Sequence, residues 1–496
     1  MNQPPQSNAA GRSSSELPYS LPGLSPNTTQ DAVVVVPGIM GSELYDTTTD
    51  TVLWGLANPG WLGKAWTTRK GLEPLHLTDD ERGGKTGRVK ARRLLRTPAW
   101  SPFLRGIEPY HELLTTIRKT VAHKDAILPF AYDWRLPVAA NALELAAAAR
   151  RHLEQWRRHP AHTAARRHRV DEREGRLVFI AHSMGGLLTH AALALGPDRD
   201  LAADTRGVMT LGTPFHGAVM AASILNTGQG APLPLPHGKL KTLASTMPGV
   251  HDLLPRFPCL DEGLNVRRLT PTDVADLGGD KDLAVQSQAF YDKLRGHTLP
   301  NHRAVVGISQ RTLESMTLKD GVVTGFEHTF REHTDGELMR DPHGIPRRFP
   351  VGGDGTVHKE AASPTRHIIP FSLQHGALAT GEAAMEAVTS FLQEDAHLGP
   401  EQAASGLGLT VPDFITPHAT WEIQITGTDD PAGITCTIAG VDGDFTKRAR
   451  LYADDDDALT ARIQVPDVGL YRVTVDTDGP APLTQLVLAG SDADED

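Results

Sequence analysis

Cysteine is scarce in this sequence, and long hydrophobic runs are missing. Cys259 and Cys436 are the only two cysteines among 496 residues, and they fall in segments of different character. A structural disulfide is therefore not expected, which is typical of proteins that fold in a reducing cytoplasm. No run approaches the roughly 18 apolar residues of a membrane span. The sequence thus predicts a soluble, cytoplasmic protein.

The first thirty residues lack the pattern of a secretory signal. They are rich in Ser, Pro, Asn and Gln, without a charged start followed by an apolar stretch. We interpret residues 1–30 as a disordered leader.

Positive charge is scarce in the last hundred residues. Residues 401–496 contain 5 Lys and Arg against 18 Asp and Glu, a net charge of −13, whereas the first 400 residues carry +2. An acidic surface repels phosphate groups, which argues against nucleic acid or anionic membrane as a partner of this part. A protein partner for the acidic part is the remaining expectation.

Between the leader and residue 396, short apolar runs alternate with helical patterns. Helix-like segments cover 139–158 and 378–393. Continuous apolar strands with intervening helices are typical of a parallel sheet covered on both faces, so we predict an α/β domain over 31–396. The strand-like runs are 32–36, 126–133, 177–181, 207–212, 303–308 and 367–373.

The pattern changes after this domain. Residues 397–411 are rich in Gly, Ala and Ser and are predicted to be a linker. Residues 412–496 alternate apolar with polar side chains between regularly spaced turns. That alternation is typical of a small antiparallel β-sandwich.

A serine lies at the junction of a strand and a helix. The run LVFIA leads directly into HSMGG at 182–186, and a helix-like segment follows. A strand, a sharp turn that carries serine and a helix form the nucleophile elbow of α/β-hydrolases, so Ser183 is the predicted nucleophile. The strained turn leaves room only for small residues two positions away, here Ala181 and Gly185. We expect His182 to be packed or exposed rather than the base, because neighbours on a strand point to opposite faces.

The acid and the base must follow the serine in that order along the chain. His375 follows the last apparent strand and precedes a helix with apolar residues on one face. Asp354 lies 21 residues earlier in the loop VGGDGTV, where a carboxylate can hold the imidazole tautomer. The loop at 351–358 that carries Asp354 is called the acid loop. His358 lies in this loop and His367 lies at the start of the last strand, so both are weaker alternatives for the base.

Two backbone N–H groups near the elbow are needed to stabilise an oxyanion. Met184, directly after the nucleophile, is predicted to supply one. The other is expected from the loop PGIMGS after the first strand, from Ile39 or alternatively from Met40. No metal motif was found, and the chemistry requires no cofactor.

Four motifs follow one another along the chain: PGIMGSEL at 37–44, YDWRLP at 132–137, AHSMGG at 181–186 and GTPFHGA at 212–218, followed by GGDGTV at 352–357 and His375. In the second motif we expect a buried Asp133–Arg135 pair that braces the sheet edge. Together the motifs resemble the lecithin:cholesterol acyltransferase family, which includes lysosomal phospholipase A2-type enzymes, over about residues 31–395. The resemblance implies an α/β-hydrolase that attacks a lipid ester through an acyl-enzyme.

The chain departs from the family in the lid. Secreted animal members have a lid disulfide near the oxyanion loop, and this chain has no cysteine there. We predict a lid over about 45–100 and a cap over about 218–300. Trp54, Trp61 and Trp66 fall within thirteen residues of the lid, where they either contact a membrane surface or pack in the core.

Three functions fit these observations. The leading hypothesis is a serine hydrolase of lipid carboxylic esters, similar to lipases and phospholipases A, with peripheral membrane contact. An O-acyltransferase that passes the acyl group to an alcohol shares the same acyl-enzyme. The third is a partner-regulated effector that degrades membrane lipids.

Overall fold

The computed structural model describes residues 28–55, 71–82, 85–96, 98, 110–168, 172–196, 201–226, 235–333, 335–364, 368–394, 407–454, 458–477 and 482–490. No helix in these ranges is both long and apolar enough to cross a membrane. Thr29 and Gln30, which the sequence analysis assigned to the leader, are buried, and the N–H of Thr29 donates to the carbonyl of Thr120 at 2.8 Å.

A parallel sheet of six strands forms the centre of the α/β domain, as predicted. Every neighbouring pair is parallel, and the order across the sheet is β13-β10-β7-β6-β1-β5. All five residues of β1 are buried, because helices cover both faces of the sheet. The strands are β1 (Ala32–Val36), β5 (Ile127–Pro129), β6 (Leu177–His182), β7 (Thr205–Leu211), β10 (Arg303–Gly307) and β13 (Ile368–Phe371).

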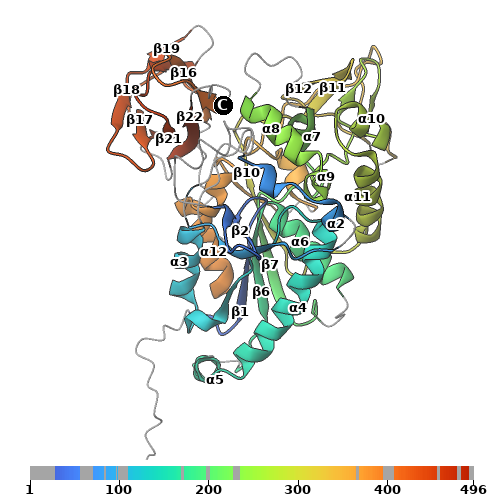
Figure 1. Cartoon of the computed structure of the whole chain (residues 1–496), viewed down its shortest axis with the longest axis vertical. Coiled ribbons are helices and arrows are strands. Elements are labelled where there is room, and N and C mark those ends of the chain that lie inside the picture. The colour runs from blue at the N-terminus through green and yellow to red at the C-terminus, as the bar shows by residue number, and fades with distance from the viewer. Residues whose placement is uncertain are drawn as a thin grey trace, which may run out of the picture.

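Helices pack on the two faces of this sheet. Helices α3 and α12 pack together on one side, and α4 and α6 on the other (Figure 1). The apolar stripe of α12 is buried, as its periodicity predicted. The helices are α3 (His111–Thr120), α4 (Val138–Arg157), α5 (Pro160–Arg167), α6 (Met184–Leu195) and α12 (Glu382–Gln393), with 3-10 turns η2 (Lys124–Ala126), η3 (Lys359–Ala362) and η4 (Gly376–Ala379).

Two insertions surround the carboxyl end of the sheet. The first, in the predicted lid region, contains a three-stranded sheet in the order β3-β2-β4. The second corresponds to the predicted cap and extends beyond residue 300, because β11 pairs with β8. The first insertion has β2 (Ser42–Asp46), β3 (Val52–Trp54), η1 (Glu73–Leu75), α2 (Asp79–Arg82) and β4 (Val89–Leu94); the second has α7 (Val219–Asn226), α8 (Leu235–Ala244), α9 (Pro248–His251), β8 (Leu260–Asp261), β9 (Val266–Arg267), α10 (Pro271–Asp276), α11 (Lys281–Leu294), β11 (Ser315–Lys319) and β12 (Val322–Phe326).

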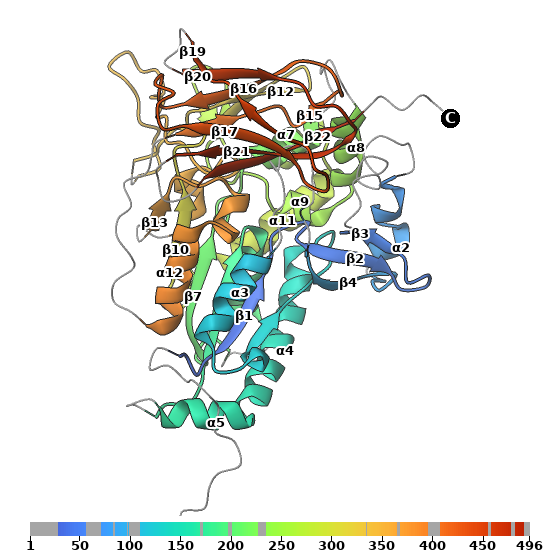
Figure 2. The ribbon, with the colours of Figure 1, turned by 90° about the vertical axis from the view of Figure 1, so that its left-hand side faces the viewer.

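The C-terminal part is a β-sandwich with its own hydrophobic core, as predicted. One sheet has the order β14-β16-β20-β19 and the other β15-β22-β21-β17-β18. In Figures 1 and 2 it lies at one end of the α/β domain, and α5 lies at the other end. Its first strand begins inside the predicted linker. The strands are β14 (Gly408–Thr410), β15 (Phe414–Ile415), β16 (Trp421–Thr426), β17 (Thr435–Gly440), β18 (Thr446–Ala449), β19 (Tyr452–Ala453), β20 (Ala458–Ile463), β21 (Gly469–Asp476) and β22 (Leu483–Ala489).

Candidate active site

Ser183 lies at the sharp turn between β6 and α6. Its backbone has φ 52° and ψ −128°, a conformation that costs a non-glycine residue free energy and that surrounding contacts must enforce. The N–H of Ser183 donates to the carbonyl of Leu211 at 2.9 Å, which ties the turn to β7. A Cβ at Gly185 would lie 2.5 Å from the carbonyl oxygens of Val36 and Pro37, so the turn requires glycine there.

The structure brings Ser183, His375 and Asp354 together. The Oγ of Ser183 lies 2.8 Å from Nε2 of His375, and Nδ1 of His375 lies 2.7 Å from Oδ2 of Asp354. All three side chains are buried. With Nδ1–H donating to the carboxylate, Nε2 is left free to accept the serine proton, which is the arrangement of a Ser-His-Asp triad.

Backbone groups fix the orientation of the Asp354 carboxylate. Its Oδ1 accepts the N–H groups of Thr356 at 2.9 Å and Val357 at 2.7 Å. The carbonyl of Asp354 also accepts the N–H of His375 at 2.9 Å. One carboxylate oxygen is thus held by its own loop, and the other is left for the imidazole.

Glu314, which was not predicted from the sequence, holds the acid loop through hydrogen bonds to two of its N–H groups. Its carboxylate accepts the N–H of Gly352 at 2.6 Å and the N–H of Val351 at 3.2 Å. Burial raises the pKa of Glu314 from 4.5 to about 7, although these two hydrogen bonds oppose the shift. The Glu314 carboxyl, which contacts the acid loop, therefore gains or loses its proton near neutral pH.

The loop after β1 lies directly against the nucleophile. A Cβ on Gly38 would come within 2.9 Å of the Cβ of Ser183, so only glycine allows this approach. The N–H of Gly38 is already donated to the hydroxyl of Tyr110 at 2.8 Å. Among the described backbone hydrogen bonds, none is donated by Ile39 or Met184. Ile39 and Met184, with Met40 as the alternative to Ile39, remain the candidates for the oxyanion hole.

Tyr110 and His182 connect this loop to the histidine. The Tyr110 hydroxyl lies 2.9 Å from Nδ1 of His182, and Nε2 of His182 lies 2.9 Å from the carbonyl oxygen of His375. That carbonyl can only accept, so Nε2 of His182 carries the proton and Nδ1 accepts from Tyr110. Burial lowers the pKa of His182 to about 3, which keeps the ring neutral. His182 is packed, as predicted. Its contacts with Tyr110 and His375 could not be predicted, because no sequence motif relates these residues to it.

The structure describes one of the two alternative bases, His358. His358 is buried and lies edge-on to Phe257, with ring centroids 4.7 Å apart, and burial lowers its pKa to about 3. No described hydrogen bond joins it to Ser183. His367 lies outside the described residues.

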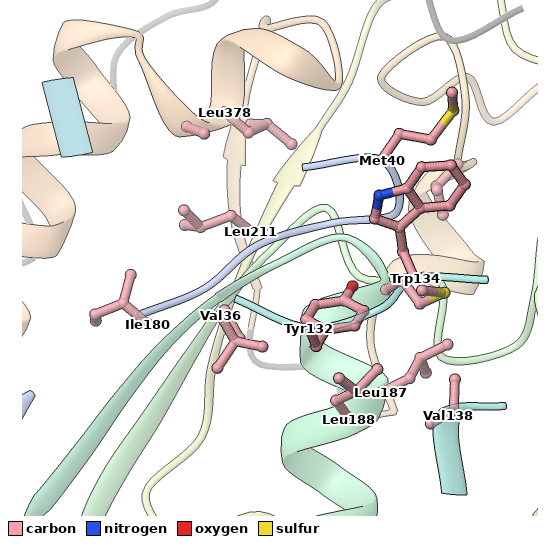
Figure 3. Packing of buried hydrophobic residues seen from close by; sticks show 14 of the residues in the cluster. Val36, Met40, Tyr132, Trp134, Val138, Ile180, Leu187, Leu188, Leu211 and Leu378 are labelled. Carbon is pink, nitrogen blue, oxygen red and sulfur yellow. The ribbon is translucent and has the colours of Figure 1, made fainter. Parts of the chain in front are cut away.

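An apolar cavity opens at Ser183 and His375. The oxyanion loop forms one wall, Trp134 contributes to the cavity and lies beside Met40 in Figure 3, and α7 and α8 of the cap form the far wall. The lining contains no Asp, Glu, Lys or Arg side chain. Such a cavity accepts a hydrocarbon chain better than a polar group. Its lining from the cap is Ala218, Met220, Ala221, Ile224, Leu240, Leu243, Ala244, Met247, Val250 and Leu253.

The tryptophan cluster of the lid is only partly within the described residues. Trp54 is fully buried, its indole N–H donates to the carbonyl of Met40 at 2.8 Å, and its ring lies edge-on to Trp134. Of the two predicted roles, packing in the core agrees with the structure for Trp54. A buried ring that packs against the loop at 37–42, the oxyanion loop, cannot contact a membrane. Trp61 and Trp66 lie outside the described residues.

The expected Asp133–Arg135 pair is present and has a third member. Nε and Nη2 of the buried Arg135 donate to the Asp133 carboxylate at 2.9 Å and 2.7 Å. Nη2 also donates to Glu81 of the lid region at 2.9 Å. Despite burial, hydrogen bonds from the backbone N–H of Thr78, from Arg88 and from Arg135 lower the pKa of Glu81 to about 2. The cluster fastens the lid region to the sheet edge.

One group of described side chains has the spacing of a metal site. His123, Asp125 and His159 lie on the surface, with Asp125 Oδ2 3.5 Å from His123 Nδ1 and 3.6 Å from His159 Nε2. The Nδ1 atoms of the two histidines already accept backbone N–H groups, from Asp125 and Ala161. The histidines therefore cap the first turns of η2 and α5, and the group lies apart from Ser183.

Comparison with known sequences and structures gives one family. The model of the lecithin:cholesterol acyltransferase family matches residues 102–276, which include three of the four motifs but neither Asp354 nor His375. No curated protein matches the sequence.

Two solved structures illustrate the extent of structural likeness. A crystal structure of the Tle4–Tli4 complex matches with 13% identity and a TM-score of 0.48, covering 74% of this chain and 99% of that one. A PKD domain of an M14-like peptidase from Thermoplasmatales archaeon SCGC AB-540-F20 matches with 24% identity and a TM-score of 0.13, covering 17% of this chain and 93% of that one. The family resemblance predicted from the motifs is thus confirmed by the sequence comparison: residues 102–276 match the lecithin:cholesterol acyltransferase family.

Proposed function

We propose that the protein is a serine hydrolase that cleaves lipid carboxylic esters through an acyl-enzyme. The observation that carries the proposal is the apolar cavity that ends at Ser183 and His375. An ester carbonyl carbon at Ser183 would place its acyl part against this hydrocarbon lining, which favours an apolar acyl group over a polar one. The match to an acyltransferase family supports the same ester chemistry.

In the proposed reaction, Oγ of Ser183 attacks the ester carbonyl carbon and Nε2 of His375 takes its proton. Asp354 keeps the imidazole in the tautomer required for this step and stabilises the imidazolium. The N–H groups of Ile39 and Met184 stabilise the oxyanion, and the helix that begins after Ser183 adds its positive end. The leaving alcohol receives the proton from His375, and the acyl-enzyme remains.

Water or an alcohol then attacks the acyl-enzyme, which separates hydrolysis from acyl transfer. The matched family is described as an acyltransferase family, so acyl transfer to an alcohol is the second candidate function. Both candidates use the same residues, so only the products distinguish them.

The experiment is incubation with liposomes of phospholipids and neutral lipid esters of varied head group and chain length, with and without an added alcohol. Mass spectrometry is expected to detect free fatty acid for hydrolysis and a new ester for acyl transfer. Ser183→Ala, at equal concentration, is the control and should give neither. Absence of both products from every lipid, or products that persist with Ser183→Ala, would contradict the proposal.

A further inference from the structure

The C-terminal sandwich is attached to the α/β domain through an apolar face. In β22, Val487 points into the sandwich core, whereas the adjacent Leu486 and Leu488 belong to the core of the α/β domain. Both leucines are at most 1% exposed. The strand is thus buried on both faces, and the half-buried Ile308, directly after β10, packs against the same core.

One polar side chain crosses this boundary. Gln310, three residues after β10, is 1% exposed. Its Nε2 donates to the carbonyl of Leu407 at 3.0 Å, and its Oε1 accepts the N–H of Leu409 at 3.4 Å. The amide therefore pairs with the backbone at the start of β14 much as a neighbouring strand would.

The backbone of the same residue holds the acid loop. The N–H of Gln310 donates to the carbonyl of Gly353 at 3.0 Å, and the N–H of Gly353 donates back at 3.2 Å. Thr312 reinforces the pair, because its hydroxyl donates to the carbonyl of Gln310 and accepts the N–H of Gly355, both at 2.9 Å. Asp354 lies between these two anchored glycines.

Hydrogen bonds and short covalent segments thus form a continuous path from the sandwich to Ser183. From β14 they pass through the amide and backbone of Gln310 to Gly353, and from the next residue, Asp354, to His375 and Ser183. The Asp354 carboxylate must be placed to within a fraction of an ångström to orient the imidazole.

We propose that Gln310 is a positioning residue through which the sandwich holds Asp354 in its working orientation. The sandwich then contributes to the rate of the chemical step and not to binding of the lipid, because none of the sandwich residues that the structure describes lines the apolar cavity. This inference rests on the proposed function, since it assigns a consequence to the contact between Asp354 and His375.

The test uses the full chain with Gln310→Met, which keeps the side-chain volume and removes both hydrogen bonds to β14. Gln485→Met is the matched control: Gln485 is 2% exposed and its Nε2 donates to the carbonyl of Val411 at 3.3 Å, within the sandwich and away from the acid loop. For Gln310→Met, kcat on a soluble short-chain ester should fall about 10- to 100-fold with KM within about twofold. Gln485→Met should keep both constants.

Hydrogen–deuterium exchange measures the stability of the acid loop independently of enzymatic activity. Backbone amides in 351–358 should exchange faster in Gln310→Met and at the wild-type rate in Gln485→Met. Gln310→Ala is the second variant, because the space that it leaves allows water to satisfy Leu407 and Leu409. It should show the same faster exchange and the same loss of kcat.

Two results would overturn the inference: wild-type kcat and exchange in both Gln310 variants, or equal losses in the Gln310 and Gln485 variants. The second would mean general destabilisation. A wild type that cleaves no ester would contradict the proposed function instead, and the exchange rates would still decide whether the sandwich holds the acid loop.

Discussion

Tyr110 illustrates how one buried side chain serves two parts of the site. Its hydroxyl accepts the N–H of Gly38 in the oxyanion loop and donates to His182, which in turn donates to the backbone of His375. The loop that we propose to offer the oxyanion donors and the histidine that we propose to move the proton are therefore fixed relative to one another. This connection involves residues 72 and 193 positions apart, so no local sequence pattern could have predicted it.

Replacing Tyr110 by Phe tests this connection. The variant leaves the buried N–H of Gly38 and Nδ1 of His182 without partners, which should cost about 1–3 kcal/mol of unfolding free energy. The oxyanion loop should loosen, so kcat should fall by about tenfold while KM changes little. Steady-state kinetics and urea unfolding measure the two effects. The exposed Tyr452→Phe is the control, and equal kinetics in both variants would refute the role of Tyr110.

Single residues that follow from local geometry were predictable. Ser183 was found because a strained turn between a buried strand and a helix restricts its neighbours to small residues, and Gly185 indeed touches two carbonyl oxygens. Trp54 was ambiguous, because a tryptophan suits both a core and a membrane surface. Only its contacts with Met40 and Trp134 decide that it packs inside.

At the scale of elements, the strands were the most predictable part. Uninterrupted apolar runs such as 32–36 have to be buried on both faces, which only a covered parallel sheet provides. The strand predicted over 126–133 is shorter, Ile127–Pro129, and its pairing with β1 ends with the hydrogen bond from the N–H of Phe130 to the carbonyl of Val35. Loops were least predictable: Glu314 and Gln310 hold the acid loop from positions about forty residues away.

Glu314 makes the acid loop sensitive to pH. Its pKa of about 7 exceeds the ordinary 4.5, so the folded state binds its proton more tightly than the unfolded state between those values. Its contribution to stability is therefore fully present below about pH 4.5 and is lost as pH rises through about 7.

The variant Glu314→Gln should remove this dependence, because an amide oxygen still accepts from Gly352 without carrying charge. Its melting temperature should equal or exceed that of the wild type at pH 8, and the two should approach one another near pH 5. Thermal unfolding across this pH range provides the measurement, with the exposed Glu422→Gln as the control. A variant that melts lower than the wild type at pH 8 would contradict this account.

At the scale of the whole molecule, the sandwich packs against the α/β domain through buried leucines. Leu470, Leu486 and Leu488 are buried in the core of that domain, and each contributes up to about 1.5–3 kcal/mol relative to an exposed side chain. Composition and alternation predicted the sandwich fold itself. Its contact with the α/β domain could not be predicted, because from the sequence alone leucines on the second face of a strand are equally consistent with an exposed apolar patch.

Removing residues 401–496 should therefore destabilise the remaining chain. The apolar surface that the sandwich covers would be exposed, and the shortened chain should melt at a lower temperature and aggregate at concentrations where the full chain stays monodisperse. Scanning calorimetry and light scattering measure these effects. A shortened chain with unchanged melting temperature and solubility would establish an independent module instead.

The most direct test of the account is covalent labelling of the nucleophile. Oγ of Ser183 should attack the phosphorus of a fluorophosphonate and expel fluoride, which leaves one phosphonate ester per chain, located by peptide mass spectrometry. Ser183→Ala should remain folded, take up no label and lose on the order of 10⁶-fold in turnover. Labelling at another residue, or an equally labelled Ser183→Ala, would contradict the assignment of Ser183, Asp354 and His375 as the catalytic residues.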